Sequence, residues 1–462
     1  MANKIVFNKD LIRRYDTSGP RYTSYPTAVQ FTTDFTKDDY ENWAHRSNED
    51  PIPAPLSLYL HIPFCDTICY YCGCSKVITK DKSKAAPYIK LLKQEIKLQG
   101  ALFEKDREVS QIHWGGGTPT FLSDTKIYEI IECIRENFNV PANNEIEFGI
   151  EVDPRTVDQQ RIKNLANMGF NRISIGVQDF DVDVQQAVNR VQSTEEIKQH
   201  ITNARAENFK SINIDLMYGL PKQSHESFSK TLDTTIQLSP DRIAIYNYAH
   251  LPEMFKPQRR INENELPSAE EKLNILQLCI SKLQNSGYVY IGMDHFAKES
   301  DDLVKAQQHG SLHRNFQGYS THADCDMIAM GITAIGRIGE NYSQNVRSIE
   351  EYENCLKQNK IPVFRGIELE ADDVLRREVI NELMCNNELN ISNLEKRWGI
   401  NFKNYFKSSL ENLQQMAEDD LLKIGTKKLS ITSSGRLLAR AICMQFDRYL
   451  LENNNNRFSR VI

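Results

Sequence analysis

The sequence predicts an α/β fold with a parallel sheet, and two observations support this prediction. Short runs rich in β-branched and aromatic residues recur along the chain, and roughly 20–50 residues separate each from the next, which leaves room for a helix. Several of these runs are apolar almost throughout, as is typical of strands covered on both faces. The six runs are residues 56–62, 111–114, 146–152, 172–177, 212–217 and 242–246.

The segments before and between these strands are predicted in chain order. Residues 1–55 are polar and aromatic with little periodicity, and one Gly and two Pro interrupt residues 18–27, so we expect an extended N-terminal arm. A helix of ordinary length is expected over residues 88–102. Two further apolar runs, 288–293 and 327–336, are expected to extend the sheet.

The chain turns helical and charged after about residue 365, which predicts a separate C-terminal helical domain. Within it, residues 421–434 predict a small hairpin, followed by a helix over 435–451. This pattern resembles a winged helix, although the acidic balance argues against DNA binding. The expected domains are therefore an arm (1–55), a catalytic domain with an extension (56–364) and the helical domain (365–462).

Composition limits the classes of protein to consider. With 462 residues, of which 40% are hydrophobic and 26% charged, the chain is long enough for more than one hydrophobic core. It lacks an apolar run of membrane-spanning length, and its start lacks the pattern of a secretory signal, so we expect a cytoplasmic protein. A net charge of −6 argues against nucleic acid as a partner.

Polar residues follow several of the predicted strands. Parallel α/β folds place their chemistry at the carboxyl ends of strands. For one strand alone, a solvated loop is an equally good interpretation, but the recurrence on four strands favours a site. These residues are Glu151 and Asp153, Gln178 and Asp179, Asp215, and Asn247.

Four of the ten cysteines fall within ten residues, at Cys65, Cys69, Cys72 and Cys74. The first three have the spacing C-x3-C-x2-C, which suits three ligands of a [4Fe-4S] cluster and leaves the fourth iron open to another molecule. A structural zinc site of all four is the alternative, but zinc usually takes two separated pairs. The scattered cysteines are expected to be buried small apolar residues.

A glycine-rich segment, WGGGTP at residues 114–119, follows the second predicted strand. Glycines at Gly115, Gly116 and Gly117 would let a ligand approach the backbone closely. A glycine triplet alone is usually a turn. Its position one strand after the cysteine loop makes a cofactor cradle the better interpretation.

Several motifs together resemble one family, the oxygen-independent coproporphyrinogen III oxidases, also called coproporphyrinogen dehydrogenases, of the radical S-adenosylmethionine (SAM) superfamily. The likeness runs almost from end to end, from SGPRYTSYP at residue 18 to the closing FSRVI at 458–462. The other matching segments are YLHIPFC at 59–65, IEVDP at 150–154, GVQDF at 176–180, NIDLMYGLP at 213–221 and HRNFQGY at 313–319.

The resemblance implies an open (β/α)6 partial TIM-type barrel with an N-terminal arm and a helical C-terminal domain. The implied reaction is the oxidative decarboxylation of two propionates of coproporphyrinogen III to vinyls, a step of haem and porphyrin biosynthesis. The implied cofactors are a [4Fe-4S] cluster and two equivalents of S-adenosylmethionine, whose cleavage yields a 5′-deoxyadenosyl radical.

The resemblance also assigns roles to residues. Cys65, Cys69 and Cys72 would bind the cluster, and Tyr59 would lie beside the cluster and cofactor as a catalytic residue. By the same resemblance, four polar residues would contact the amino acid and ribose of S-adenosylmethionine: Glu151, Gln178, Arg190 and Asp215. These pairings are chemically apt, because carboxylates suit ribose hydroxyls and an arginine suits a carboxylate. Further residues would complete the cofactor pockets: Gly115, Gly116, Gly117, Thr118, Tyr71, Ala249, Gln317 and Ile335.

Two positions need separate comment. The family usually has Phe where Tyr71 stands, so this position gains a hydroxyl. Cys74 distinguishes the chain from related haem chaperones that carry the first three cysteines, and we treat it as a functional residue rather than a ligand. Because the substrate has four carboxylates, cations are also needed, and the candidates are Arg21, Arg13, Arg14, His313 and Arg314; a solvated surface charge is the alternative for each arginine of the polar arm.

The expected partners are coproporphyrinogen III and a one-electron donor of the flavodoxin or ferredoxin type, with the protein a monomer. Two other functions stay open at this stage. One is a haem chaperone that keeps the cluster but does not decarboxylate, and the other is a radical SAM enzyme with a different substrate. Cys74 and the arm argue against the first, and the arm and the closing FSRVI argue against the second.

Overall fold

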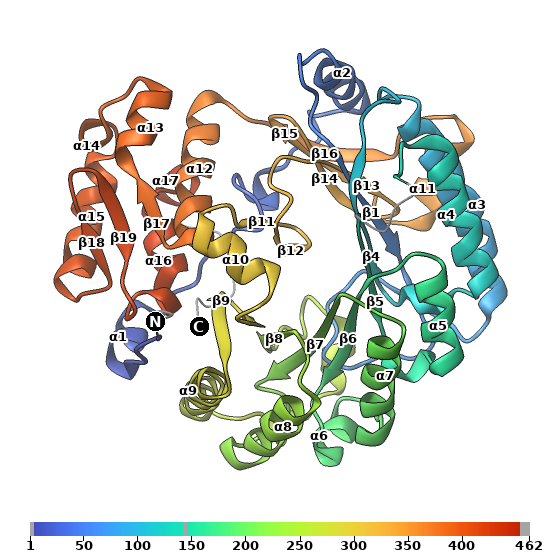
Figure 1. Ribbon diagram of the computed structural model, residues 1–462, viewed down its shortest axis with the longest axis horizontal. Helices are drawn as coiled ribbons and strands as arrows, with labels where there is room; N and C mark the ends of the chain where they lie inside the picture. The colour runs from blue at the N-terminus through green and yellow to red at the C-terminus, as the bar shows by residue number, and fades with distance from the viewer. Residues whose placement is uncertain (1–3, 142–145, 453–462) are drawn as a thin grey trace. The chain divides into compact units, whose positions relative to one another are not determined.

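The computed structural model describes residues 4–141 and 146–452, and the chain forms two compact units (Figure 1). We call them the barrel unit, made of Phe31–Lys272 and Asp324–Glu368, and the terminal unit, made of Met1–Gln30, Leu273–Ala323 and Leu369–Ile462. The units follow spatial contacts rather than chain order. As domain limits, 1–55, 56–364 and 365–462 stay a prediction.

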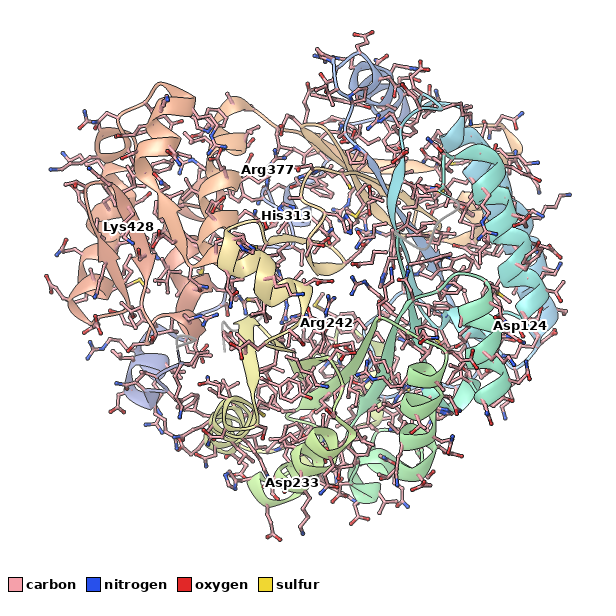
Figure 2. The ribbon with its side chains drawn as sticks, in the orientation of Figure 1. Asp124, Asp233, Arg242, His313, Arg377 and Lys428 are labelled. Atoms are coloured by element: carbon pink, nitrogen blue, oxygen red, sulfur yellow. The ribbon has the colours of Figure 1, made fainter. Side chains whose placement is uncertain are left out.

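The barrel unit contains the six predicted strands as one parallel sheet. Neighbouring strands pair in the order β1-β4-β5-β6-β7-β8, so chain order and spatial order agree. The strands are β1 (Leu56–Ile62), β4 (Val109–Gly116), β5 (Glu147–Val152), β6 (Arg172–Gln178), β7 (Ser211–Tyr218) and β8 (Arg242–Asn247), and Figure 2 labels Arg242 where β8 begins. The predicted α/β partial barrel is confirmed.

Helices cover the outer side of these strands (Figure 1). Their apolar faces are buried, and exposed polar residues such as Asp233 lie on the opposite face (Figure 2). The helices are α3 (Ala85–Gly100), α4 (Asp124–Asn137), α5 (Gln159–Asn167), α6 (Val182–Ala187), α7 (Thr194–Ala206) and α8 (His225–Leu238).

On its other edge, β1 pairs in parallel with β13 (Asp326–Met330), and the sheet continues antiparallel through β14 (Ile335–Ile338), β15 (Asn341–Asn345) and β16 (Val363–Glu368). The prediction of one run over 327–336 is wrong, because the chain reverses between β13 and β14. Gly331 and Thr333 have φ values of 98° and 61° there, a conformation that ends a strand. Helix α11 (Ile349–Lys357) connects β15 to β16.

Two helices lie in the segment predicted as an extended arm, α1 (Lys9–Tyr15) and α2 (Lys37–Asn48). Each begins with a capping side chain: Asn8 accepts from two backbone N–H groups of α1, and Thr36 forms a capping box with Asp39 at α2. Such caps stabilise helices whose apolar periodicity is weak. The extended description of these two stretches is therefore wrong.

The terminal unit collects elements from three parts of the chain. Its middle segment carries most of α9 (Ala269–Asn285), the antiparallel pair β9 (Tyr288–Gly292) and β10 (His295–Lys298), α10 (Asp302–His309), and the pair β11 (His313–Asn315) and β12 (Gly318–Ser320). Its last segment is mainly helical, with α12 (Ala371–Asn386), α13 (Ile391–Trp398), α14 (Phe402–Tyr405) and α15 (Lys407–Glu418).

The predicted hairpin is present as β18 (Leu422–Ile424) and β19 (Lys428–Ile431), to which β17 (Glu388–Asn390) adds a third strand. The single helix predicted over 435–451 is wrong. The chain forms a short 3-10 turn, α16 (Ala439–Met444) and α17 (Arg448–Glu452), with an interruption at Asp447. The Asp447 carboxylate accepts from Tyr449 N at 3.0 Å, a local bond that competes with a continuous helix.

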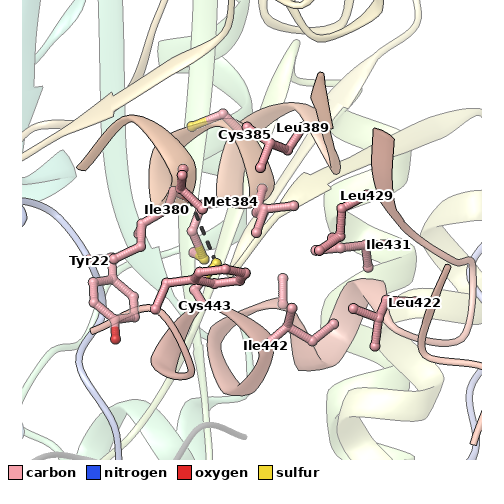
Figure 3. Close-up of a cluster of buried hydrophobic side chains, with 14 of the residues drawn as sticks. Tyr22, Ile380, Met384, Cys385, Leu389, Leu422, Leu429, Ile431, Ile442 and Cys443 are labelled. Carbon is pink, nitrogen blue, oxygen red and sulfur yellow. Dashed lines mark hydrogen bonds between the residues drawn. The ribbon is translucent and has the colours of Figure 1, made fainter. Parts of the chain in front are cut away.

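The core of the terminal unit joins residues from both ends of the described chain (Figure 3). Tyr22 and Tyr25 are buried in it together with side chains of α12 and α16. The Tyr22 hydroxyl donates to Asp447 at 3.0 Å, and Arg448 N donates to the Tyr25 hydroxyl at 3.1 Å. Cys385 and Cys443 lie in this core, where Cys443 Sγ donates to Ile380 O at 3.7 Å.

None of the helices in the described part of the chain combines the length and apolar character needed to span a membrane. The closing FSRVI motif, at 458–462, lies outside the described residues.

Candidate active site

The three cysteines of the C-x3-C-x2-C motif lie on one closed loop of the barrel unit. The loop runs between β2 (Phe64–Cys65) and β3 (Val77–Ile78), which pair in parallel directly after β1. Thr79 N donates to Cys65 O at 3.0 Å and closes the loop, and Cys72 N donates to Cys69 O at 3.2 Å within it. The backbone therefore holds the three thiols in a fixed order around one turn.

Each of the first two thiols has a polar partner from a different element. Cys65 Sγ lies 3.4 Å from Thr118 Oγ1, and burial, with a smaller contribution from the nearby Cys72 and Cys69 thiols, raises the pKa of Cys65 to about 11. Cys69 is buried, and its sulfur accepts from Arg190 Nη1 at 3.4 Å and Arg155 Nη2 at 3.5 Å. Guanidinium groups favour the thiolate, the form that binds metals.

Cys72 and Cys74 interact with each other. A hydrogen bond with the Cys74 thiol, together with the Lys76 ammonium and against the effect of burial, lowers the pKa of Cys72 to about 5. Lys76 Nζ also donates to Cys72 O at 2.9 Å. Cys74 itself is exposed.

The four thiols are not arranged for a single ion. Among residues 4–141 and 146–452, no three His, Cys, Asp or Glu side chains stand together as ligands of one metal ion. A tetrahedral zinc site needs all its ligands within about 2.3 Å of one point. Three thiols spread around one loop fit the corners of a larger iron–sulfur cube in donor type and number.

The glycine segment packs closely against its neighbours, at distances that leave no room for side chains. A Cβ atom on Gly115 would lie 2.9 Å from a Glu151 carboxylate oxygen, and one on Gly117 would lie 2.7 Å from the Pro63 carbonyl carbon. Gly116 has a φ of 111°, and its Cβ would lie 2.7 Å from the His61 ring. Any larger residue here would displace the cysteine loop or the Glu151 side chain, so the segment fits a backbone cradle.

Two carboxylates extend from β5 and β7, the strands on either side of β6 in the sheet. Glu151 on β5 lies 3.2 Å from His113 Nε2, and Asp215 on β7 accepts from Ser174 Oγ and Asn213 Nδ2, each at 2.8 Å. Burial raises the pKa of Asp215 to about 6, and the Glu151 charge adds to this effect. The two carboxylates therefore lie in the same region of the barrel. Hydroxyl or ammonium groups of a ligand could donate hydrogen bonds to them.

Arg190 connects this region to the cysteine loop. Besides Cys69, it donates to Asp153 Oδ2 at 2.9 Å and to Gly176 O at 3.1 Å. Burial alone would raise the pKa of Asp153, but Arg190 and Arg155 outweigh it and lower that pKa to about 2. Gln178 lies at the end of β6 with a φ of 71°, next to a break in the strand register.

Tyr59 lies within β1 between two histidines. Its hydroxyl is 3.3 Å from His61 Nδ1, and its ring stacks on His113 with centroids 6.1 Å apart. Burial raises the pKa of Tyr59 and lowers that of His61, so both rings stay neutral around pH 7. The side chain is half-buried beside the Glu151–His113 pair.

Three other residues predicted to contact the cofactor also lie in the barrel unit. Gln258 Nε2 donates to Tyr71 O at 3.0 Å and to Ala249 O at 3.3 Å, which joins these two positions. Ile335 is half-buried at the start of β14.

The remaining predicted residues lie in the terminal unit. Gln317 follows β11, and His313 Nδ1 is 3.0 Å from Asn381 Nδ2 (Figure 2). Arg314 is 7% exposed and lies over the Tyr319 ring, 5.0 Å from its centroid. Arg21 pairs with Asp294, Arg14 with Asp419 and Arg13 with Asp10.

The sequence analysis missed the roles of His113, His61 and Arg155. His113 comes directly before the WGGG segment, and Arg155 follows the Asp153-Pro154 pair, so both stand next to recognised motifs. Their roles depend on contacts across strands, which no single segment of sequence displays.

Comparisons with known proteins agree with this geometry. The Radical SAM superfamily model matches residues 59–235, and the HemN C-terminal domain model matches 369–438. The "Oxygen-independent coproporphyrinogen III oxidase" of Pseudomonas aeruginosa is 49% identical, and the protein of the same name from Escherichia coli is 47% identical, each over 100% of both chains. A solved structure described as "Coproporphyrinogen III oxidase (HemN) from Escherichia coli is a Radical SAM enzyme" superimposes with a TM-score of 0.91 at 45% identity, covering 96% of this chain and 100% of that one. The chain therefore belongs to the oxygen-independent coproporphyrinogen III oxidase family of radical SAM enzymes.

Proposed function

We propose that this protein catalyses the oxygen-independent oxidative decarboxylation of two propionates of coproporphyrinogen III to vinyls, giving protoporphyrinogen IX for haem and porphyrin biosynthesis. Full-length relatives bear the name of this activity. The observation that carries the proposal is the cysteine loop with its glycine cradle, which stands beside the carboxylates at Glu151 and Asp215 in one unit.

Cys65, Cys69 and Cys72 would hold the [4Fe-4S] cluster, and the glycine segment would bind S-adenosylmethionine. When bound and reduced, the cluster supplies the electron that cleaves S-adenosylmethionine to a 5′-deoxyadenosyl radical, a reagent able to take a hydrogen atom from the carbon β to a carboxylate. Arg190 and Arg155 hold the Cys69 sulfur in place through their N–H groups.

The polar residues of the barrel would orient S-adenosylmethionine. Glu151 and Asp215 suit its ammonium and ribose hydroxyls, and Arg190 suits its carboxylate. Gln178, Thr118, Tyr71, Ala249 and Ile335 would complete the pockets. For Gln317, which belongs to the terminal unit, a contact with the cofactor stays a prediction. Tyr59, kept neutral by burial, would close the site beside the cluster, and Cys74 would act near Cys72 without being a ligand.

The substrate carboxylates would bind cations of the terminal unit. Arg314 carries the clearest structural support: it is buried, and its Nε and Nη1 atoms have no hydrogen-bond partner among the described residues. Buried N–H groups without acceptors are costly, and a propionate would satisfy these two. Arg21 and His313 are the other candidates.

The reaction also requires an electron donor, for which we propose a protein of the flavodoxin or ferredoxin type. We further propose that the enzyme works as a monomer in the cytoplasm. Each electron transfer would reduce the cluster by one electron, and each propionate would consume one S-adenosylmethionine.

The test is anaerobic incubation of the reconstituted protein with dithionite, S-adenosylmethionine and coproporphyrinogen III, beside Cys69→Ala. We expect protoporphyrinogen IX and 5′-deoxyadenosine, both lost in the variant. Deoxyadenosine without a vinyl product would point instead to a chaperone or to another substrate. If neither product forms from protein whose cluster is shown to be reducible, the proposal fails.

A further inference from the structure

A surface segment, residues 249–261, packs directly against the cysteine loop. A Cβ atom on Gly73 would lie 3.1 Å from Cζ of Phe255, so the Phe255 ring covers the residue next to Cys72. Gln258 donates to Tyr71 O at 3.0 Å, and the Arg260 guanidinium lies 5.4 Å from the centroid of the Tyr70 ring. The segment therefore contacts the loop on both sides of Tyr71, next to the third cysteine of the motif.

The outer side of this segment combines apolar and basic side chains. Leu251 is 41% exposed and Met254 is 64% exposed. The 3-10 turn Lys256–Arg260 adds the exposed cations Lys256, Arg259 and Arg260. We call these five residues the donor face. Met and Arg side chains are enriched at protein–protein interfaces relative to the rest of the surface.

The charge of the donor face differs from that of the whole protein. Three cations face one exposed acid of the same stretch, Glu253, while the chain as a whole carries a net charge of −6. The next acid along the chain, Glu263, lies 3.1 Å from His250 Nε2. A local positive surface on an acidic protein favours a partner with an acidic surface.

We propose that the donor face docks an acidic one-electron carrier protein that reduces the cluster of the cysteine loop. This inference rests on the proposed function, because only a redox cluster in that loop requires such a partner. The carrier would give up one electron and a cluster held by Cys65, Cys69 and Cys72 would take it up, and no bond is formed or broken. Close approach is needed because electron transfer slows steeply with distance, and the donor face contacts the loop itself.

The basic residues are suited to a transient encounter. Charges at the rim of an interface mainly accelerate association, and salt weakens their effect because the Debye length is about 8 Å at physiological ionic strength. Met254 and Leu251 would supply the small apolar centre of the contact. A weak contact of this kind lets the carrier leave after each electron.

The experiment compares two double variants with the same change in net charge. Lys256→Glu/Arg259→Glu alters the donor face, and Lys198→Glu/Lys230→Glu alters exposed lysines on α7 and α8 of the same unit. Cluster-loaded proteins receive electrons either from photoreduced flavodoxin, with an acidic ferredoxin as a second carrier, or from excess dithionite. The readouts are the stopped-flow rate of cluster reduction and the yield of 5′-deoxyadenosine.

We expect the donor-face variant to be reduced about tenfold more slowly by the carrier at low salt, which is within the range that rim charges exert on association. The difference from wild type should shrink at high salt, and reduction by dithionite should stay within about twofold. Met254→Gln should weaken carrier-driven reduction without changing its salt dependence. The control variant should behave as wild type throughout.

Three outcomes would overturn the inference. Carrier-driven reduction could be unchanged in the donor-face variant, it could fall equally with dithionite, or neither carrier could reduce the wild-type cluster. A failure of the proposed function is separate, since it would appear as absence of vinyl product from wild type reduced by dithionite.

Discussion

Among the carboxylates of the site, Asp215 has a pKa that its surroundings raise toward neutral pH. Its pKa rises to about 6 because the group is buried and lies near the Glu151 charge. An unfolded chain would ionise the same carboxyl near pH 3.9. Raising the pH from about 4 to about 6 therefore lowers the contribution of this residue to the free energy of unfolding. Above pH 6 the buried carboxylate is charged, and hydrogen bonds from a bound ligand would stabilise it.

The first prediction concerns pH and cofactor binding. If Asp215 accepts hydrogen bonds from S-adenosylmethionine, its ionised form binds better, so affinity should fall as the pH drops through about 6. Between pH 7.5 and 5.5 we expect the Kd to rise about two- to threefold, because about 1 kcal/mol is lost when a charge-assisted hydrogen bond becomes neutral and the carboxyl is only partly protonated at pH 5.5.

Anaerobic equilibrium dialysis of the cluster-loaded protein measures this dependence. Asp215→Asn should bind more weakly at pH 7.5 and lose the dependence on pH. An unchanged pH profile in that variant would show that another group titrates.

At the residue scale, the sequence predicted the groups that chemistry makes distinctive. Cysteines at a cluster spacing and a glycine triplet can be recognised from the sequence alone. The stack of Tyr59 on His113 does not, because it depends on the register of β1 with β4, which places these two residues opposite each other. Arg155 was missed for a similar reason, since its bond to Cys69 joins residues 86 positions apart.

At the scale of elements, Arg190 links three parts of the barrel unit. One side chain after α6 bonds the Gly176 carbonyl of β6, the Asp153 carboxylate after β5, and the Cys69 sulfur of the cysteine loop. The planar guanidinium reaches all three because its donors are fixed in a fork. The loop therefore depends on the strand ends for its position.

The second prediction follows from that geometry. In Arg190→Lys the charge remains but the fork is lost, so the cluster should be retained about tenfold less well, as is usual when a partner of a metal ligand is removed. Arg172→Lys is the matched control, because Arg172 pairs with Glu147 at 2.8 Å on the same strands, away from the cysteines.

Iron and sulfide per chain, followed during incubation with a chelator, measure the loss. Equal retention in the two variants would show that Arg190 does not position the cysteine loop.

Strands were predicted more accurately than helices, and burial explains the difference. Several barrel strands are apolar almost throughout, which marks them in the sequence, and five of the six agree with the structure within one residue at each end. Helices α1 and α2 depend on caps rather than on periodicity. At the break, the Asp447 carboxylate accepts from Tyr449 N and also from the hydroxyl of Tyr22, which lies 425 positions away.

At the scale of the whole molecule, the beginning of the chain completes the core of the terminal unit. Tyr25 is 2% exposed, and its hydroxyl accepts from Arg448 N. Arg440 Nε donates to Pro20 O at 3.0 Å, so the segment is held through its backbone as well. The folding of the terminal unit therefore requires residues that were predicted as a separate arm.

The third prediction tests this requirement. Tyr25→Ala should lower the free energy of unfolding by about 3–5 kcal/mol, the usual cost of removing a buried aromatic ring. Tyr128→Ala, at a position 51% exposed on α4, should change it by less than about 0.5 kcal/mol. Urea denaturation followed by circular dichroism provides the comparison, and similar values for both variants would show that the N-terminal segment does not stabilise the unit.

The central claim is that a radical generated beside the cysteine loop takes hydrogen from the substrate. The direct measurement uses coproporphyrinogen III deuterated at the propionate carbons β to the carboxylates, with mass spectrometry of the 5′-deoxyadenosine formed. We predict one deuterium in each 5′-deoxyadenosine and two such molecules for each protoporphyrinogen IX, with none from Cys69→Ala. Deoxyadenosine that carries no deuterium while vinyl product accumulates would contradict the account.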